Sequence, residues 1–212
     1  MHRKNPNSSR RVAPTFMKKL FTLLTLSCSL GVSTAQGPLS AEDLQKIAPR
    51  FAERAADQEN PPFKSEVDAA KSVGMKVKEY GAVILPAKGL SKEALAKGDK
   101  QIVPVGQLWL KQLAPSVSRE KLRVVSVHLD KRDHSFPLLF LGVRMTDGGG
   151  AELLVFGKDK EPIATLPLTK VESSQDAPVG INMQAGSTSL GVIEITVLGQ
   201  YRARLAVDEF AP

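Results

Sequence analysis

Cysteine and histidine are scarce in this chain of 212 residues, which has one cysteine and three histidines. A single cysteine cannot form an intrachain disulfide bond. A structural zinc site takes four Cys or His ligands, whereas only two histidines and no cysteine lie beyond residue 35. Neither kind of cross-link is therefore expected. The hydrophobic core has to stabilise the fold alone, and it is large enough, because chains of about 150 residues already bury roughly two-thirds of their unfolded surface.

Acidic residues are missing from the first 35 positions, which hold six of the 29 Lys and Arg. Lys18 and Lys19 precede the apolar to weakly polar residues 20–32, and the small residues Ser33 and Ala35 suit signal peptidase. We therefore expect a signal peptide cleaved after Ala35. The protein is then exported, and is periplasmic or secreted.

Residues 1–16 precede Met17, a natural start for such a leader, and are interpreted as an upstream extension. Three other interpretations of the leader remain open. A membrane anchor would need about 20 apolar residues, more than the thirteen found here. A twin-arginine signal at Arg10 and Arg11 would lack the apolar residues that usually follow it, and lipidation of Cys28 would lack the usual preceding sequence.

Removal of the leader leaves 23 Lys and Arg against 22 Asp and Glu, a net charge of +1. The sequence pI of about 9.5 therefore reflects the leader and not a basic surface. Nucleic-acid binding, which needs a basic patch, has no support. Nucleotide binding has none either, because no GxGxxG motif or P-loop is present.

The rest of the chain falls into two segments that differ in their predicted secondary structure. Residues 36–118 mix helical and strand patterns and predict a small α+β segment, whereas residues 119–212 are uniformly strand-like. The length fits one large or two small domains, and the number stays open.

A helix is expected to begin after Ser40, whose side chain can cap it, with two acidic residues in the first turn. Apolar side chains then recur at spacings of three and four, at Leu44, Ile47, Phe51 and Ala55. This stripe predicts a surface helix packed on the β part, with a partner-binding amphipathic helix as the alternative. Pro49 should kink or split it. Further short helices are expected at 65–72 and 91–97, and strands at 80–85 and 107–113.

Alternation with a period of two dominates the second segment and predicts strands with two distinct faces. Seven strands are expected, at 124–129, 138–145, 152–156, 162–168, 179–184, 192–198 and 201–207. Such short, regularly spaced strands favour an antiparallel β-sandwich, immunoglobulin-like or jelly-roll. The Tyr201 region resembles the tyrosine corner of immunoglobulin-like sandwiches, without their cysteine pair.

The densest polar cluster contains His128, Asp130, Asp133 and His134. These residue types can bind a divalent metal ion or act as an acid and a base, so the cluster is the candidate site of a metal-dependent hydrolase. The alternative is a solvated hairpin, in which residues 131–135 connect two strands. The two cations within the cluster favour the hairpin.

Other polar motifs are weaker. The loop at 186–191 lacks the GxSxG pattern of a nucleophile elbow. Asp147 and the three glycines after it lack the further acidic ligands of a calcium loop and predict a hairpin tip. Trp109 stands between two leucines and is expected to be buried. Arg144, Arg202 and Arg204 could form a basic stripe for an anionic glycan if their strands are neighbours.

The predicted function is therefore an exported envelope or secreted module without enzymatic activity, structural or protein-binding. The metal-dependent hydrolase and the glycan-binding sandwich are the alternatives. No cofactor, nucleic-acid partner or membrane span of the mature chain is implied. The protein partner and the oligomeric state do not follow from the sequence.

Overall fold

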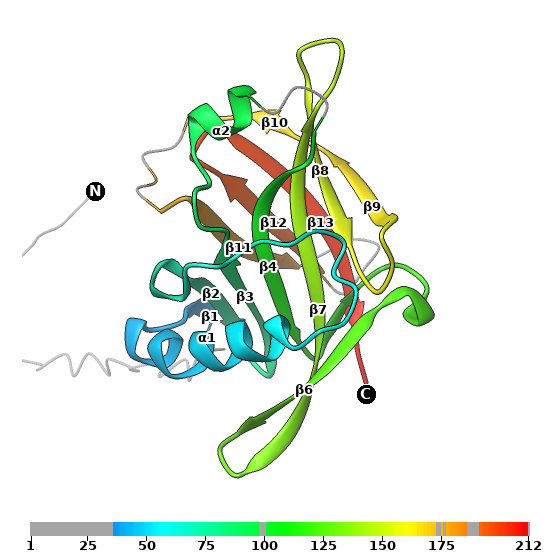
Figure 1. Ribbon diagram of the computed structural model, residues 1–212. Coiled ribbons are helices and arrows are strands. Elements are labelled where there is room, and N and C mark those ends of the chain that lie inside the picture. The colour runs from blue at the N-terminus through cyan, green and yellow to red at the C-terminus, as the bar shows by residue number, and fades with distance from the viewer. Residues whose placement is uncertain (1–35, 98–100, 173–174, 176, 186–190, 212) are drawn as a thin grey trace, which may run out of the picture. The chain divides into compact units, whose positions relative to one another are not determined.

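A computed structural model describes residues 36–97, 101–172, 175, 177–185 and 191–211. The expected signal peptide and most of the 186–191 loop lie outside these residues. The described chain is mainly β, with antiparallel sheets and a small helical segment in a sandwich-like arrangement (Figure 1).

The larger sheet has eight strands, of which seven follow the order β1-β2-β3-β4-β7-β8-β9. The eighth strand, β6, pairs with the first half of β7, on the same edge that β8 pairs with further along. Its members are β1 (Gln36–Pro38), β2 (Val73–Val77), β3 (Tyr80–Pro86), β4 (Val103–Lys111), β6 (Arg123–Leu129), β7 (Arg132–Met145), β8 (Ala151–Phe156) and β9 (Pro162–Pro167). Every pairing in it is antiparallel.

The smaller sheet has five strands in the order β10-β13-β12-β11, with β5 also paired to β13. Its members are β5 (Leu113–Pro115), β10 (Thr169–Lys170), β11 (Val179–Ala185), β12 (Gly191–Val197) and β13 (Tyr201–Glu209). The chain passes from the larger to the smaller sheet at Gln112, whose φ is 56°, and again at the buried Leu168. Strands from residues 36–118 and from residues 119–212 thus take part in both sheets.

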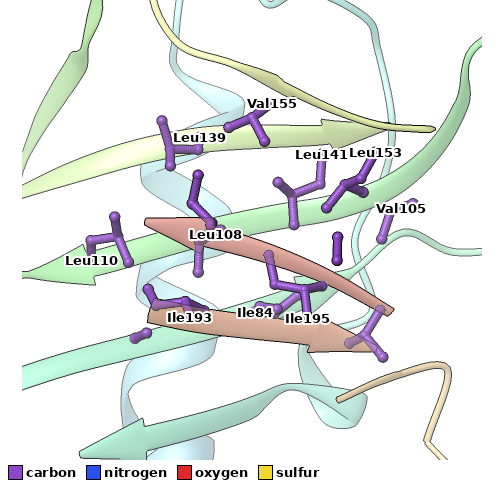
Figure 2. Close-up of a cluster of buried hydrophobic side chains, with 14 of the residues drawn as sticks. Ile84, Val105, Leu108, Leu110, Leu139, Leu141, Leu153, Val155, Ile193 and Ile195 are labelled. Carbon is purple, nitrogen blue, oxygen red and sulfur yellow. The ribbon is translucent and has the colours of Figure 1, made fainter. Parts of the chain in front are cut away.

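The main core lies between the facing sides of the two sheets (Figure 2). Figure 2 shows aliphatic side chains of both sheets directed into this layer, among them Leu108, Leu139 and Ile195. In β12 and β13 the inward residues alternate with more polar outward ones, as the sequence predicts. Tyr201 lies partly buried against this core.

A second core covers the other side of the larger sheet. Helix α1 (Ala41–Ala56) packs there through Ala48, Phe51 and Ala55, against strand residues that include Trp109. Both faces of β3 and β4 are therefore buried, which explains why their sequences are almost continuously apolar. The predictions of a packed helix and of a buried Trp109 are both confirmed.

Two expected helices differ from the structure, and strands β1, β2, β5 and β10 were not expected. Pro49 does not split α1, because it lies on the exposed side, where the carbonyl group deprived of its partner can bind water. The helix expected at 65–72 is only the 3₁₀ turn η1 (Ala69–Lys71), and β2 follows it unpredicted. The remaining helices are α2 (Lys92–Lys97), as expected, and the 3₁₀ turn η2 (Arg119–Lys121).

Candidate ligand-binding cavity

Strands β6 and β7 form a hairpin that projects beyond the rest of the larger sheet (Figure 1). The predicted bounds of the hairpin connection, 131–135, are wrong, because β7 begins at Arg132 and the turn consists of Asp130 and Lys131 alone. Both turn residues have positive φ angles, 48° and 66°. This is the geometry of a type I′ turn, whose twist matches that of the two strands.

The hairpin separates the members of the predicted hydrolase site. His128 and Asp133 are cross-strand neighbours, and the His128 Nδ1 atom lies 2.9 Å from Asp133 Oδ1. Their side chains are 66% and 73% exposed. His134 pairs with Val127, so it lies on the opposite face of the hairpin. Asp130 is in the turn.

This arrangement supplies one exposed His–Asp pair. No three His, Cys, Asp or Glu side chains of the described residues gather closely enough to hold a metal ion. An exposed pair on a hairpin also lacks the water-excluding pocket that acid–base catalysis uses. Asp147 lies between β7 and β8, which form an antiparallel pair around it.

The three arginines of the predicted basic stripe lie in different sheets. Arg144 is in β7 and forms a 2.8 Å ion pair with Glu152 of β8. Arg202 and Arg204 are in β13 of the smaller sheet, and both contact Glu194, at 3.2 and 3.4 Å. Strands β7 and β13 are not neighbours, and each of the three arginines has a carboxylate partner.

A cavity of about 230 Å³ lies between α1, strands β2 to β4 and the β6–β7 hairpin, and we call it the α1 cavity. Helix, sheet and hairpin each contribute apolar side chains to its wall. These are Ile47, Phe51, Val83, Trp109, Leu129 and Phe136, together with Leu39 just before α1. Met75 also borders the cavity, but its side chain packs against the main core on the other face of the sheet.

Aromatic rings form the deep end of the α1 cavity. Phe51 of α1 stacks on Trp109 with 4.4 Å between ring centroids and 6° between planes. Phe136 of β7 meets Phe51 edge-on, at 5.1 Å. The indole nitrogen of Trp109 is buried and has no hydrogen-bond partner among the described residues. An orphaned buried donor is uncommon in proteins, and a ligand oxygen or a water molecule would satisfy it.

Polar residues surround the mouth of the cavity. Lys76 of β2, Gly81 of β3 and Lys111 of β4 are direct cross-strand partners and therefore share one face of the sheet. Asp43 of α1 and His134 also line the mouth. The adjacent Tyr80 has a raised pKa, mainly because of desolvation and then because of the negative charges of Glu209 and Glu79.

The α1 cavity did not follow from the sequence. Trp109 was recognised as buried, but Lys76 stands in a strand that was not predicted, and its partners are five and 35 positions away. The one available signal was the alternation of Val73, Met75 and Val77 around Gly74 and Lys76. That pattern indicates a strand with a polar face.

Comparisons with known proteins give no further lead. No protein-family model, curated protein or solved structure matches the chain. No described helix has both the length and the apolar character needed to cross a lipid bilayer.

Proposed function

We propose that this protein is an exported, non-enzymatic binding module that holds a small apolar molecule in the α1 cavity. The observation that carries the proposal is the apolar cavity itself, which has an aromatic deep end and a polar mouth. Concave sites with mostly apolar walls and a few polar groups are typical of small-molecule binding. Export, to the periplasm or beyond, is supported by the composition of residues 1–35.

The cavity volume limits the size of the ligand. A cavity of about 150 Å³ lined by apolar side chains accommodates benzene, so about 230 Å³ suits roughly nine non-hydrogen atoms. Many ligand sites are larger, at about 300–1,000 Å³. A ligand of this size gains enough from apolar contact for a Kd of about 0.1–1 mM.

The other predicted functions have less support. A structural or protein-binding role would use exposed apolar surface, and Ile102 and Val124 are the only large apolar side chains exposed in the described part of the chain. The hydrolase would have to work with the exposed His128–Asp133 pair. The glycan-binding role would have to compete with the carboxylates that already contact the arginines. The sandwich type, immunoglobulin-like or jelly-roll, stays a prediction.

Titration with a neutral apolar probe tests the proposal. Trp109 is the only tryptophan of the chain and lines the cavity, so its fluorescence should change saturably as 1-octanol is added to the mature protein. A linear or absent response over the millimolar range would contradict the proposal.

A blocking variant gives the titration its control. In Gly81→Leu the new Cβ has only ordinary contacts, at 3.5 and 3.6 Å, and the remaining carbons extend from a cavity-lining position. We expect at least a tenfold weaker response to 1-octanol. Gly148→Leu, at an open hairpin tip, should bind like the unmodified protein. Ile47→Phe is a second blocking variant on the helix side. Unchanged binding in both folded blocking variants would place the probe elsewhere.

A further inference from the structure

The mouth of the α1 cavity has a row of alternating glycine and lysine residues. Across β1 to β4, Gly37 is opposite Lys76, Lys76 is opposite Gly81, and Gly81 is opposite Lys111. Directly opposed residues of neighbouring strands project to the same face, and strands lie about 4.8 Å apart. The two lysines therefore stand about 10 Å apart at the backbone, on the side of the sheet that α1 covers.

Gly81 keeps the space between the two lysines open. Every other residue type would place a Cβ there, about 3.5 Å from the Lys111 Cβ atom. The row directly beneath carries Val83 and Trp109, which belong to the cavity wall. A group resting on Gly81 between the ammonium ions is thus continuous with the apolar interior.

Neither lysine side chain forms an ion pair or a hydrogen bond with any residue that the structure describes. The acidic groups of the mouth come from α1 and from the hairpin turn, not from the strands. Asp43 accepts a 2.8 Å hydrogen bond from the Ser40 hydroxyl group within the cap of α1. Asp130 is an exposed residue of the hairpin turn. Strands β2 to β4 therefore contribute two positive charges and no negative charge to the mouth.

We propose that the ligand is a medium-chain monocarboxylate, with its carboxylate between Lys76 and Lys111 over Gly81 and its alkyl chain in the α1 cavity. This inference rests on the proposed function and adds the chemical class of the ligand. Octanoate has a suitable size, since its alkyl chain approaches the roughly nine atoms that the cavity accommodates. Two lysines around one carboxylate are a charge-assisted arrangement.

A comparison of isosteric ligands tests the inference. Isothermal titration calorimetry of the mature protein with octanoate, 1-octanol and octylammonium should give about tenfold tighter binding for octanoate than for 1-octanol at low ionic strength. The difference should shrink at about 0.5 M salt, because the lysines are partly in solvent. Equal affinities for octanoate and 1-octanol would contradict the inference that the ligand carries a carboxylate, but would leave the proposed function intact. Tighter binding of octylammonium would likewise overturn it.

Charge-removing variants locate the carboxylate. Lys76→Met and Lys111→Met should each weaken octanoate binding about threefold, and together about tenfold, with a clearly smaller effect on the binding of uncharged 1-octanol. Lys78→Met, in the turn beside β2 and outside the cavity wall, is the matched control and should have no effect. An unchanged octanoate affinity in the double variant would overturn the site. Tighter binding of N-acetyl-leucinate than of octanoate would indicate that the site binds peptide carboxyl termini. It would contradict the inference that the ligand is a medium-chain monocarboxylate.

Discussion

Gly106 shows how a single residue controls the middle of the larger sheet. Its φ angle is 149°, and the pairing of β4 with β7 shifts by one residue between Pro104 and Gly106. The shift is a β-bulge, which inserts Val105 into the main core as a fully buried side chain. A Cβ on Gly106 would lie 2.2 Å from the Leu85 carbonyl oxygen. Only glycine therefore fits without a movement of β3.

We predict that Gly106→Ala lowers the free energy of unfolding by about 3 kcal/mol, because the clash involves backbone atoms of a central strand. Urea denaturation followed by circular dichroism would measure the change. Gly148→Ala is the control, since its Cβ would meet open space and should alter stability little. A decrease in the free energy of unfolding below about 1 kcal/mol for Gly106→Ala would mean that the backbone of β3 can move away from the new Cβ at little cost.

Arg123 is another residue that joins distant parts of the chain. Its guanidinium group donates hydrogen bonds to the carbonyl oxygens of Glu59, Asn60, Gly157 and Lys158. Desolvation lowers its pKa from the usual value, although the neighbouring Asp159 acts in the opposite direction. The loop after α1 is thereby attached to the turn between β8 and β9, which keeps the helix over the sheet.

At the scale of elements, α1 protects the edge of β6. Arg50 Nη1 donates to the His128 carbonyl oxygen at 2.8 Å, and Arg54 Nε donates to the Ser126 carbonyl oxygen at 3.0 Å. Four helical residues advance about 6.0 Å and two strand residues about 6.8 Å, so the spacings nearly match. Helix and strand can therefore form both bonds at once. An unpaired strand edge would otherwise be open to pairing with another chain.

The double variant Arg50→Met/Arg54→Met should lower the free energy of unfolding by about 1–2 kcal/mol, because two charge-assisted hydrogen bonds are lost. It should also speed amide hydrogen exchange in residues 123–129 and increase self-association at high concentration. Exchange mass spectrometry and sedimentation velocity would measure these effects. Arg132→Met, which removes an exposed arginine from the same hairpin, should leave exchange unchanged. Similar exchange in both variants would show that α1 does not protect the edge.

At the scale of the whole molecule, the two sheets depend on one shared core. The larger hydrophobic cluster contains residues of both sheets, including the fully buried Leu108 of β4 and Ile195 of β12. Neither sheet can keep this face buried without the other. Cooperative unfolding of the described chain follows, as for small single domains.

Leu108→Ala and Ile195→Ala should each lower stability by about 2–5 kcal/mol through the cavity left in the core. Both variants should move the same single calorimetric transition, by roughly 2–4 °C for each kcal/mol in a chain of this size. The control is Val124→Ala, which shortens an exposed side chain and should have little effect. Two transitions that respond separately to the two variants would indicate independent units.

Local patterns in the sequence were sufficient for most elements. Period-two alternation located β13 because one face of this strand is buried and the other is largely exposed, and it located β12 because apolar inward residues alternate there with more polar outward ones, although Glu194 is also buried. The apolar stripe located α1 for the same reason, and Trp109 between two leucines could be recognised as buried. These features depend on residues close together in the chain, so the sequence by itself determined them.

Only the tertiary structure decided which strands share a sheet and which side chains meet. The row of Lys76, Gly81 and Lys111 exists because three strands pair in one register, and register depends on packing over the whole sheet. The candidate metal cluster around His128 was dispersed for the same reason, since a two-residue turn set the pairing that placed His134 on the other face. Contacts between residues distant in sequence have no local signature, and the α1 cavity consists of such contacts.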